Sequence, residues 1–360
     1  MKSINHLLSQ KNKLPIIISG PCSAETEEQL ISTAIALKKT IKIDVLRAGI
    51  WKPRTKPGSF EGAGTVGLKW LLEAKRQTGL KTTVEVATAK HVEEALKHEV
   101  DILWIGARTT VNPFAVQDIA DSLQGNSKAI VLVKNPINPE LMLWEGALER
   151  FLKAGITNIG AIHRGFSKYG DSNFRNPPQW QIPIELKQHF PELTLICDPS
   201  HICGKRETLF HVAQKAMDLD FDGLMIESHL TPDLAWSDAQ QQLTPSDLLV
   251  LLEKLVIRKG KLSPALTSEI DKLRQKINVL DSDLIDVLSK RMQIVTQLGK
   301  YKKTNQVQIL QPKRWEEILN KSLEEAIEKG LGQDFIRNVF TEIHIESIKL
   351  QSKIMNEEEK

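Results

Sequence analysis

Eight short apolar runs alternate with eight helical stretches over residues 1–257, and this alternation constrains the fold more than any other feature. The strand-like runs are 16–19, 45–46, 82–86, 102–105, 130–133, 159–162, 193–196 and 224–226. The helical stretches are 27–39, 64–77, 92–98, 115–122, 139–153, 180–189, 206–218 and 246–257. This rhythm predicts an α/β fold, a (β/α)8 TIM barrel, and an open doubly wound sheet is the weaker alternative.

Residues that carry chemistry fall at the carboxyl end of each predicted strand. In chain order they are Cys22, Arg47, Glu85, Arg108, Lys134, His163 with Arg164, Asp198 with His201, and Glu227 with His229. Barrel enzymes form their active sites at this end. We therefore expect one site there, with the segment Asp198-Pro199-Ser200-His201 in a loop at its rim.

One subset of these residues could bind a metal ion. Cys22, His201, Glu227 and Asp238 offer a thiolate, an imidazole and two carboxylates, a mixed set that suits divalent Mn, Fe, Co or Zn without choosing among them. The alternative is that they are a buried apolar residue, a turn residue and salt-bridge partners. An odd number of cysteines, Cys22, Cys197 and Cys203, argues against a disulfide framework.

A second subset is cationic. It contains Arg47, Lys52, Arg54, Arg108, Lys134, Arg164 and Arg206. Cations that converge on one rim repel one another unless an anion neutralises them, and guanidinium groups match phosphate and carboxylate. For any single member, a solvated surface charge is the commoner explanation.

The overall charge and the amino terminus exclude other classes. A net charge of +3 is too small to indicate a nucleic-acid partner. Residues 1–14 lack a signal-peptide core, and no apolar stretch has membrane-spanning length, so we expect a cytoplasmic protein with no membrane partner.

Five motifs of the first 257 residues resemble the type I 3-deoxy-D-arabino-heptulosonate 7-phosphate (DAHP) synthases over about residues 14–257. They are Gly20-Pro21-Cys22-Ser23, Arg47-Ala48-Gly49 with Lys52-Pro53-Arg54-Thr55, Ile105-Gly106-Ala107-Arg108, Asp198-Pro199-Ser200-His201 and Ser237-Asp238. The resemblance implies condensation of phosphoenolpyruvate with erythrose 4-phosphate, the first step of the shikimate pathway. Asp-Pro-Ser-His is shared with the sister octulosonate-phosphate synthases, so such a synthase, or a generic phosphosugar aldolase, stays an alternative.

The same resemblance implies roles for individual residues. The metal ligands would be Cys22, His201, Glu227 and Asp238; phosphoenolpyruvate would be held by Arg47, Lys52, Arg108, Lys134 and Arg164; Arg54 and Thr55 would face the erythrose phosphate. Lys52 and Glu85 would be catalytic, with Glu85 near the attacking water. We leave Arg175 and Cys203 outside the site, because their surroundings depart from the family pattern. The resemblance begins almost at the first residue, so no amino-terminal regulatory domain is expected.

The sequence becomes purely helical after a polar linker at 258–265. In 266–360 the apolar seam of one long helix is formed by Leu266, Ile270, Leu273, Ile277, Leu280, Leu284, Val287, Ile294 and Leu298. Steps of three and four residues are typical of a coiled coil, which needs a partner helix. Two further amphipathic stretches, 312–328 and 333–354, complete a small all-α three-helix domain.

Polar residues of this domain resemble those of the all-helical chorismate mutases over about residues 265–355. Arg291 interrupts the seam, Lys302 follows on the same face, and Ser347 and Gln351 share a face of the last helix. The resemblance implies that Arg274, Arg291, Lys302, Arg314, Ser347 and Gln351 bind chorismate, with Arg291, Lys302 and Gln351 catalytic. The family carries carboxylates at the positions of Gln311 and Trp315, so the mutase rate is an open question.

Helix geometry predicts how this domain assembles. Arg274 and Arg291 are 17 positions apart, which is about 25 Å along a helix axis, too far to hold one small molecule together. If both serve one site, they come from different chains, as in the intertwined homodimers of the family. We expect a bifunctional enzyme of aromatic amino-acid biosynthesis whose synthase is inhibited by prephenate; a helical domain that only dimerises or senses ligands is the alternative.

Overall fold

The computed structural model describes residues 3–9, 15–41, 43–53, 58–258 and 264–356. The chain divides into two compact units, Met1–Arg258 and Lys259–Lys360, and each is considered by itself.

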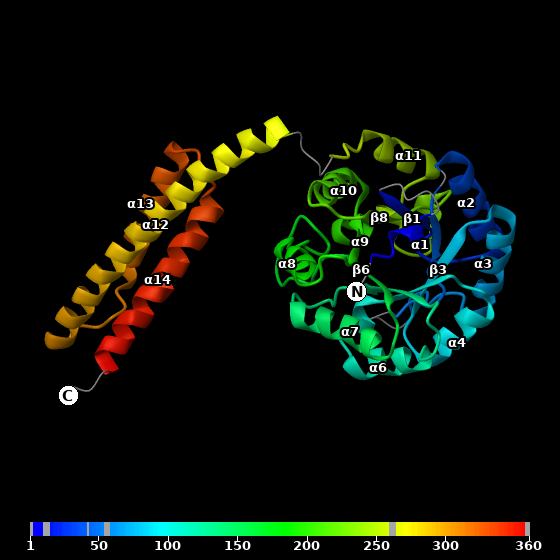
Figure 1. Ribbon diagram of the computed structural model, residues 1–360, viewed down its shortest axis with the longest axis horizontal. Coiled ribbons are helices and arrows are strands. Elements are labelled where there is room, and N and C mark those ends of the chain that lie inside the picture. Colours follow the sequence, from blue (N-terminus) through cyan, green and yellow to red (C-terminus); the bar gives the residue numbers. More distant parts are fainter. Residues whose placement is uncertain (1–2, 10–14, 42, 54–57, 259–263, 357–360) are drawn as a thin grey trace. The chain divides into compact units, whose positions relative to one another are not determined.

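The first unit is a closed barrel of eight parallel strands in sequence order (Figure 1). The strands are β1 (Ile16–Gly20), β2 (Val45–Ala48), β3 (Lys81–Val86), β4 (Ile102–Ile105), β5 (Ile130–Lys134), β6 (Asn158–His163), β7 (Thr194–Cys197) and β8 (Gly223–Glu227). Pairing of β1 with β8 closes the sheet, so the barrel prediction is confirmed and the open sheet is excluded. Most strand residues are buried because both faces of a parallel sheet are covered.

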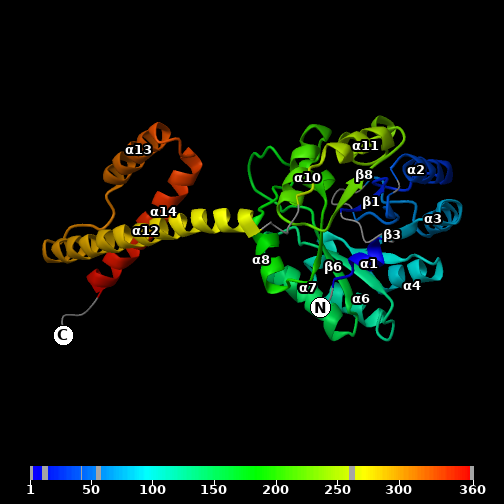
Figure 2. The ribbon, with the colours of Figure 1, turned by 45° about the horizontal axis from the view of Figure 1, so that its top comes forward.

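Helices form a ring outside the barrel (Figures 1 and 2). They are α2 (Glu27–Thr40), α3 (Thr65–Thr78), α4 (Ala89–Lys97), α6 (Pro113–Ser122), α7 (Leu141–Lys153), α8 (Gln181–His189), α10 (Leu209–Asp218) and α11 (Pro245–Lys254). The four-residue helix α5 (Ala107–Thr110) follows β4 directly. Side-chain caps determine where several of them begin: Thr26, Thr88 and Thr244 each accept a backbone N–H of the first turn.

Strand residues alternate between two cores. One set packs against the outer helices. The other fills the barrel interior and includes Ile18, Trp104 and Ile196. The short helix α1 (Asn5–Leu8) closes the amino-terminal end of the barrel, because Ile4 and Leu8 join the interior core and Ile4 N–H donates to Thr194 Oγ1 at 3.0 Å. Apolar side chains therefore fill the middle of the barrel and its amino-terminal end is covered by α1, which leaves the carboxyl end of the strands open for a site.

The segment after β7 is a one-turn helix, α9 (Pro199–Cys203), rather than the loop predicted. Asp198 caps it by accepting the backbone N–H of His201 at 3.1 Å, and Pro199 occupies the first helical position, where its missing N–H has no consequence. His201 therefore has a fixed backbone close to the strand end.

The second unit consists of α12 (Pro264–Thr304), α13 (Pro312–Glu328) and α14 (Gln333–Asn356). The amino-terminal half of α12 extends beyond the other two helices in both views (Figures 1 and 2). Its seam residues Leu273, Leu280 and Val287 are 59%, 66% and 61% exposed. None of the helices in the described part of the chain is long and apolar enough to cross a membrane.

Candidate active sites

The barrel site is built by the inward-facing residues at the carboxyl ends of the strands. Strand residues two apart point to the same face, so Arg47 continues the interior position of Val45, Lys134 that of Leu132, and Glu227 that of Met225. Arg47, Lys134 and Glu227 lie within strands, not after them as the sequence suggested. A pocket at this end is lined by Cys22, Arg47, Gly49, Trp51, Lys52, Pro53, Glu85, Trp104, Arg108, Arg164, Arg175, His201 and Asp238.

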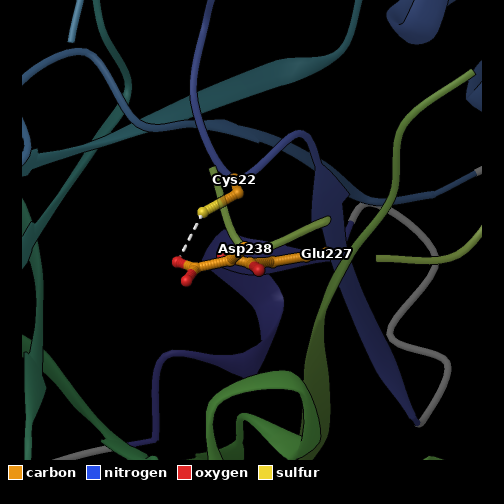
Figure 3. A group of neighbouring side chains, drawn as sticks. All are labelled: Cys22, Glu227 and Asp238. Carbon is orange, nitrogen blue, oxygen red and sulfur yellow. Dashed lines mark hydrogen bonds between the residues drawn. The ribbon is translucent and has the colours of Figure 1, made fainter. Parts of the chain in front are cut away.

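Three of the four predicted metal ligands form a tight cluster (Figure 3). The ligand atoms of Cys22, Glu227 and Asp238 all lie within 4.8 Å of one another, and Cys22 Sγ donates to Asp238 Oδ2 at 3.1 Å. His201 stands at the edge of this cluster, with Nε2 at 3.7 Å from Glu227 Oε1. A thiol and two carboxylates at this spacing, with an imidazole nitrogen beside Glu227, form a donor set that fits a divalent transition metal ion.

The charges in this cluster favour a bound cation. Burial, followed by the charge of Glu227, raises the pKa of the Cys22 thiol to about 12, even though Lys52 opposes the shift. Burial would also raise the pKa of Glu227, but His201 and Arg47 outweigh it and lower that pKa. The carboxylates are therefore ionised, while the thiol needs a further positive charge to ionise near neutral pH, and a metal ion would supply it.

Cations and an indole ring form the other side of the pocket. Lys52 Nζ donates to the Cys22 carbonyl at 3.0 Å and lies 2.6 Å from Cys22 Sγ. The Trp104 ring lies below Arg47 at 5.0 Å and Lys134 at 5.7 Å. Burial lowers the pKa of Arg164 to about 10, with contributions from Arg175 and Arg108 that Asp198 opposes. An anion bound beside Arg164 would offset this effect of burial on its guanidinium group.

Glu85 is held in place between two neighbours. Its Oε2 accepts the indole N–H of Trp104 at 2.9 Å. Its Oε1 lies so close to Gly106 that a Cβ at that position would stand 2.1 Å away. This contact explains the glycine of the Gly-Ala-Arg motif: any side chain there would displace the carboxylate.

The structure changes the predicted membership of the site at several positions. Arg175, left outside by the sequence, lines the pocket and donates to Asp238 Oδ1 and Gln241 Oε1, both at 2.9 Å. Arg206 is bound elsewhere, to Asp233 and to backbone oxygens of Gln242 and Ala239. Arg54 and Thr55 lie outside the described residues.

His163 faces away from the site although it also ends a strand. It is fully buried among the rings of Trp144, Phe166, Trp180 and Phe221, outside the barrel. The next residue, Arg164, takes the pocket position instead. The alternation of side chains along β6 therefore places Arg164, and not His163, in the pocket.

Polar residues of α12 and α14 come together in the helical unit. Arg291 Nη1 donates to Ser347 Oγ at 2.7 Å, and Gln351 Nε2 donates to the Ser347 carbonyl at 3.2 Å. Lys302 is buried and donates to the Ile309 carbonyl at 2.7 Å. Gln351 Oε1 is buried and has no hydrogen-bond partner among the residues described, so a ligand with a donor group could satisfy it.

Other predicted mutase residues do not join this group. Arg274 and Arg314 are 69% and 66% exposed and pair with Asp271 and Glu317 of their own helices. Trp315 stacks on His344 with ring centroids 4.0 Å apart, and Gln311 precedes α13 without making a side-chain cap. One chain thus brings together only part of the set of residues predicted to bind chorismate.

Comparisons with known proteins agree with both units. The sequence profile of the DAHP synthetase I family matches residues 5–259, and that of chorismate mutase type II matches residues 273–352. Phospho-2-dehydro-3-deoxyheptonate aldolase of Thermotoga maritima is 31% identical over 258 residues, covering 71% of this chain and 72% of its own. The crystal structure of that organism's DAHP synthase superposes with a TM-score of 0.59 at 29% identity, covering 66% of this chain and 67% of its own.

The helical unit has relatives of its own. A 4-amino-4-deoxychorismate mutase of Streptomyces pristinaespiralis is 28% identical over 89 residues, covering 25% of this chain and 69% of its own. With both profiles matched in order along the sequence, the chain belongs to the DAHP synthetase I family and carries a chorismate mutase type II domain at its carboxyl end.

Proposed function

We propose that the barrel condenses phosphoenolpyruvate with erythrose 4-phosphate in a metal-dependent reaction. The observation that carries this proposal is the cluster of Cys22, Glu227 and Asp238, with His201 beside it, at the edge of a pocket rich in arginine and lysine. Held by these four residues, a divalent metal ion would polarise the aldehyde oxygen as a Lewis acid.

The protein's own residues would position the second reactant. Arg47, Arg108, Lys134 and Arg164 would hold the phosphate and carboxylate of phosphoenolpyruvate, so that its C3 faces the aldehyde carbon. Lys52 Nζ, anchored at Cys22, would donate a hydrogen to the developing alkoxide. Glu85 would orient, through Oε1, the water that adds to C2 of phosphoenolpyruvate before inorganic phosphate leaves, since Oε2 is engaged by Trp104.

A comparison of two aldehydes tests the substrate. The purified protein, loaded with Mn, Co or Zn in turn, should consume phosphoenolpyruvate with erythrose 4-phosphate. A higher kcat/KM with a five-carbon aldehyde phosphate would assign it to the octulosonate-phosphate synthases instead.

The helical unit would rearrange chorismate to prephenate. This pericyclic reaction needs no nucleophile, so cations that hold the two carboxylates in a compact conformer are sufficient. Arg291, Lys302, Ser347 and Gln351 would come from one chain, and Gln351 would meet the ether oxygen as a donor. Arg314 would contribute after a shift of its exposed side chain.

A second copy of the chain would supply Arg274 and cover the exposed seam of α12. Two inactive variants, Arg274→Ala and Arg291→Ala, test this homodimer. In mixed dimers one site receives both intact arginines, so a 1:1 mixture after subunit exchange should recover about one quarter of wild-type mutase activity. No recovery, with mixed dimers demonstrated, would contradict the shared site.

Prephenate feedback is the regulatory part of the proposal. Prephenate added to the intact protein should lower its synthase rate, and a rate unchanged at saturating prephenate would exclude feedback.

One observation favours a second candidate function for the helical unit, a domain that only dimerises or senses ligands: Trp315, stacked on His344, stands where the mutase family carries a carboxylate. Chorismate left unconverted by the intact protein would establish that alternative.

A further inference from the structure

Asp198 is a fully buried carboxylate next to the barrel site, and the proposed mechanism gives it no role. Both of its oxygens are engaged. Oδ1 accepts the backbone N–H of His201, whereas Oδ2 lies 2.8 Å from Lys134 Nζ and 2.8 Å from His201 Nδ1. One oxygen atom therefore contacts a predicted metal ligand and a predicted substrate-binding cation at once.

The contact with Nδ1 decides which nitrogen of His201 is free. The carboxylate of Asp198 lies 2.8 Å from Nδ1 but off the line of a hydrogen bond, and its negative charge favours the tautomer with the hydrogen on Nδ1. In the neutral ring Nε2 then keeps its lone pair, and Nε2 is the atom directed at Glu227. Histidine ligands of metals commonly have a carboxylate on the other ring nitrogen for this reason.

The same oxygen holds Lys134. Its side chain is buried beside the Trp104 ring, which lines the pocket, and an unpaired charge there would be costly. Burial would raise the pKa of Asp198, but His201 and Lys134 outweigh it, and the pKa lies well below the ordinary value. The carboxylate therefore stays ionised and stabilises both neighbours.

We propose that Asp198 is a positioning residue that joins the two halves of the synthase site, directing His201 Nε2 toward the metal position while holding Lys134 at the anion pocket. This inference rests on the proposed metal-dependent function. An alternative role is structural: Asp198 would only cap α9. The two roles separate because the cap uses Oδ1 and the positioning uses Oδ2.

The substitution Asp198→Ser distinguishes these two roles. Asp198→Ser retains a capping hydroxyl but has no group to face Nδ1. Because this change alone would leave Lys134 unpaired and endanger folding, the deciding pair is Lys134→Met and Asp198→Ser/Lys134→Met. These proteins differ only at Asp198, and neither buries an uncompensated lysine. Co²⁺ alone, without substrate, is titrated into each metal-free protein. Its binding is measured by calorimetry and by the thiolate-to-cobalt absorption band.

We expect the double variant to bind Co²⁺ about 10- to 100-fold more weakly than Lys134→Met, from which it differs only at Asp198. Equal affinity in both variants would overturn the inference and leave the cap as the role of Asp198. A wild-type protein that binds no Co²⁺ would instead refute the proposed metal site, and the inference with it.

A second measurement does not depend on folding energetics. Nitrogen-15 chemical shifts of the His201 ring report its tautomer in the metal-free protein. Lys134→Met should show hydrogen on Nδ1, and the double variant should show a substantial population with hydrogen on Nε2. The same tautomer in both proteins would contradict the positioning role.

Discussion

Cations of the two units differ in the kind of group to which they are bonded. In the barrel, Arg47 pairs with Glu227 at 3.1 Å and Lys134 with Asp198 at 2.8 Å. In the helical unit, Arg291 donates to the neutral hydroxyl of Ser347 and Lys302 to a carbonyl. Burial would lower the pKa of Arg47, but Glu227 and other anions raise it overall, whereas burial lowers the pKa of Arg291 and of Lys302. Arg47 and Lys134 are thus each paired with a carboxylate of their own unit, whereas Arg291 and Lys302 donate to neutral groups, so a dicarboxylate ligand would compensate their charge.

The units also differ in how they complete their cores. A barrel pairs its last strand with its first, so its interior needs nothing from outside. A helical seam has no such closure, and the apolar residues of α12 stay exposed within one chain. We therefore expect synthase chemistry to depend on residues within one chain and mutase chemistry to depend on two chains.

The largest effect should come from removing the metal. Chelation, or the variant Cys22→Ala, should lower the synthase rate at least about 1000-fold, since a Lewis acid contributes several kcal/mol. Mutase activity in the same samples should not change, because its proposed site contains only cations, a hydroxyl and an amide. Cys203→Ala is the matched control, as that cysteine is buried in the outer core. Loss of both activities would contradict the expectation that only the synthase site depends on the metal ion.

Removal of Arg291 should have the next largest effect, in the other unit. Arg291→Ala should lower kcat/KM for chorismate about 100- to 1000-fold, the usual cost of one preorganised donor. The synthase rate measured with phosphoenolpyruvate and erythrose 4-phosphate should stay at the wild-type value. Arg337→Ala, at an exposed position of α14, is the control. Unchanged chorismate conversion by Arg291→Ala would remove this arginine from the mutase site.

The pH dependence of metal binding should be smaller and specific to the barrel. Burial raises the pKa of Cys22 to about 12, so a metal ion displaces a proton from the thiol at any pH near neutrality. Burial lowers the pKa of His201, and charges lower those of Glu227 and Asp238, so these groups release no further proton above pH 6.5. Affinity for Co²⁺ should rise about tenfold per pH unit between roughly 6.5 and 8.5. A flat profile would show that the thiol is already ionised.

Alternation along the strands made much of the barrel site predictable. Because Val45 and Leu132 are interior positions, Arg47 and Lys134 must point into the barrel as well. The family resemblance then predicts which of these interior residues bind metal and which bind substrate. By the same period, the interior position of Ile162 places Arg164 inside and His163 outside, so the strand pattern itself separates these two candidates.

Arg175 could not be predicted in this way. It lies in the long loop between β6 and α8, where no period relates one residue to the next, and tertiary folding brings it to Asp238. Sequence likewise predicted the seam of α12, but a repeat along one helix contains no information about which residues of α13 approach α14. The stacking of Trp315 on His344 was therefore not foreseen.

The smallest expected effect concerns the outer core of the barrel, which should influence stability without influencing chemistry. His163 is fully buried, and burial, with a contribution from Arg164, lowers its pKa to about 3. An unfolded histidine takes up a proton below about pH 6.5, whereas the folded one stays neutral, so acidification favours the unfolded state. From pH 7 to pH 5 this residue should cost about 2 kcal/mol of unfolding free energy.

The variant His163→Phe removes that proton and keeps an aromatic ring in the cluster. Its unfolding free energy, measured in urea at pH 7 and pH 5 by tryptophan fluorescence, should fall less than that of the wild type by this amount. Any strain from the larger ring changes the unfolding free energy equally at pH 7 and at pH 5, so it cancels in the difference between them. Its synthase kcat/KM should stay within about twofold of wild type, because His163 faces the helices and not the pocket. An equal acid loss in both proteins would mean that folded His163 also takes up a proton, and a large kinetic effect would mean that the outer core is coupled to the site through Arg164.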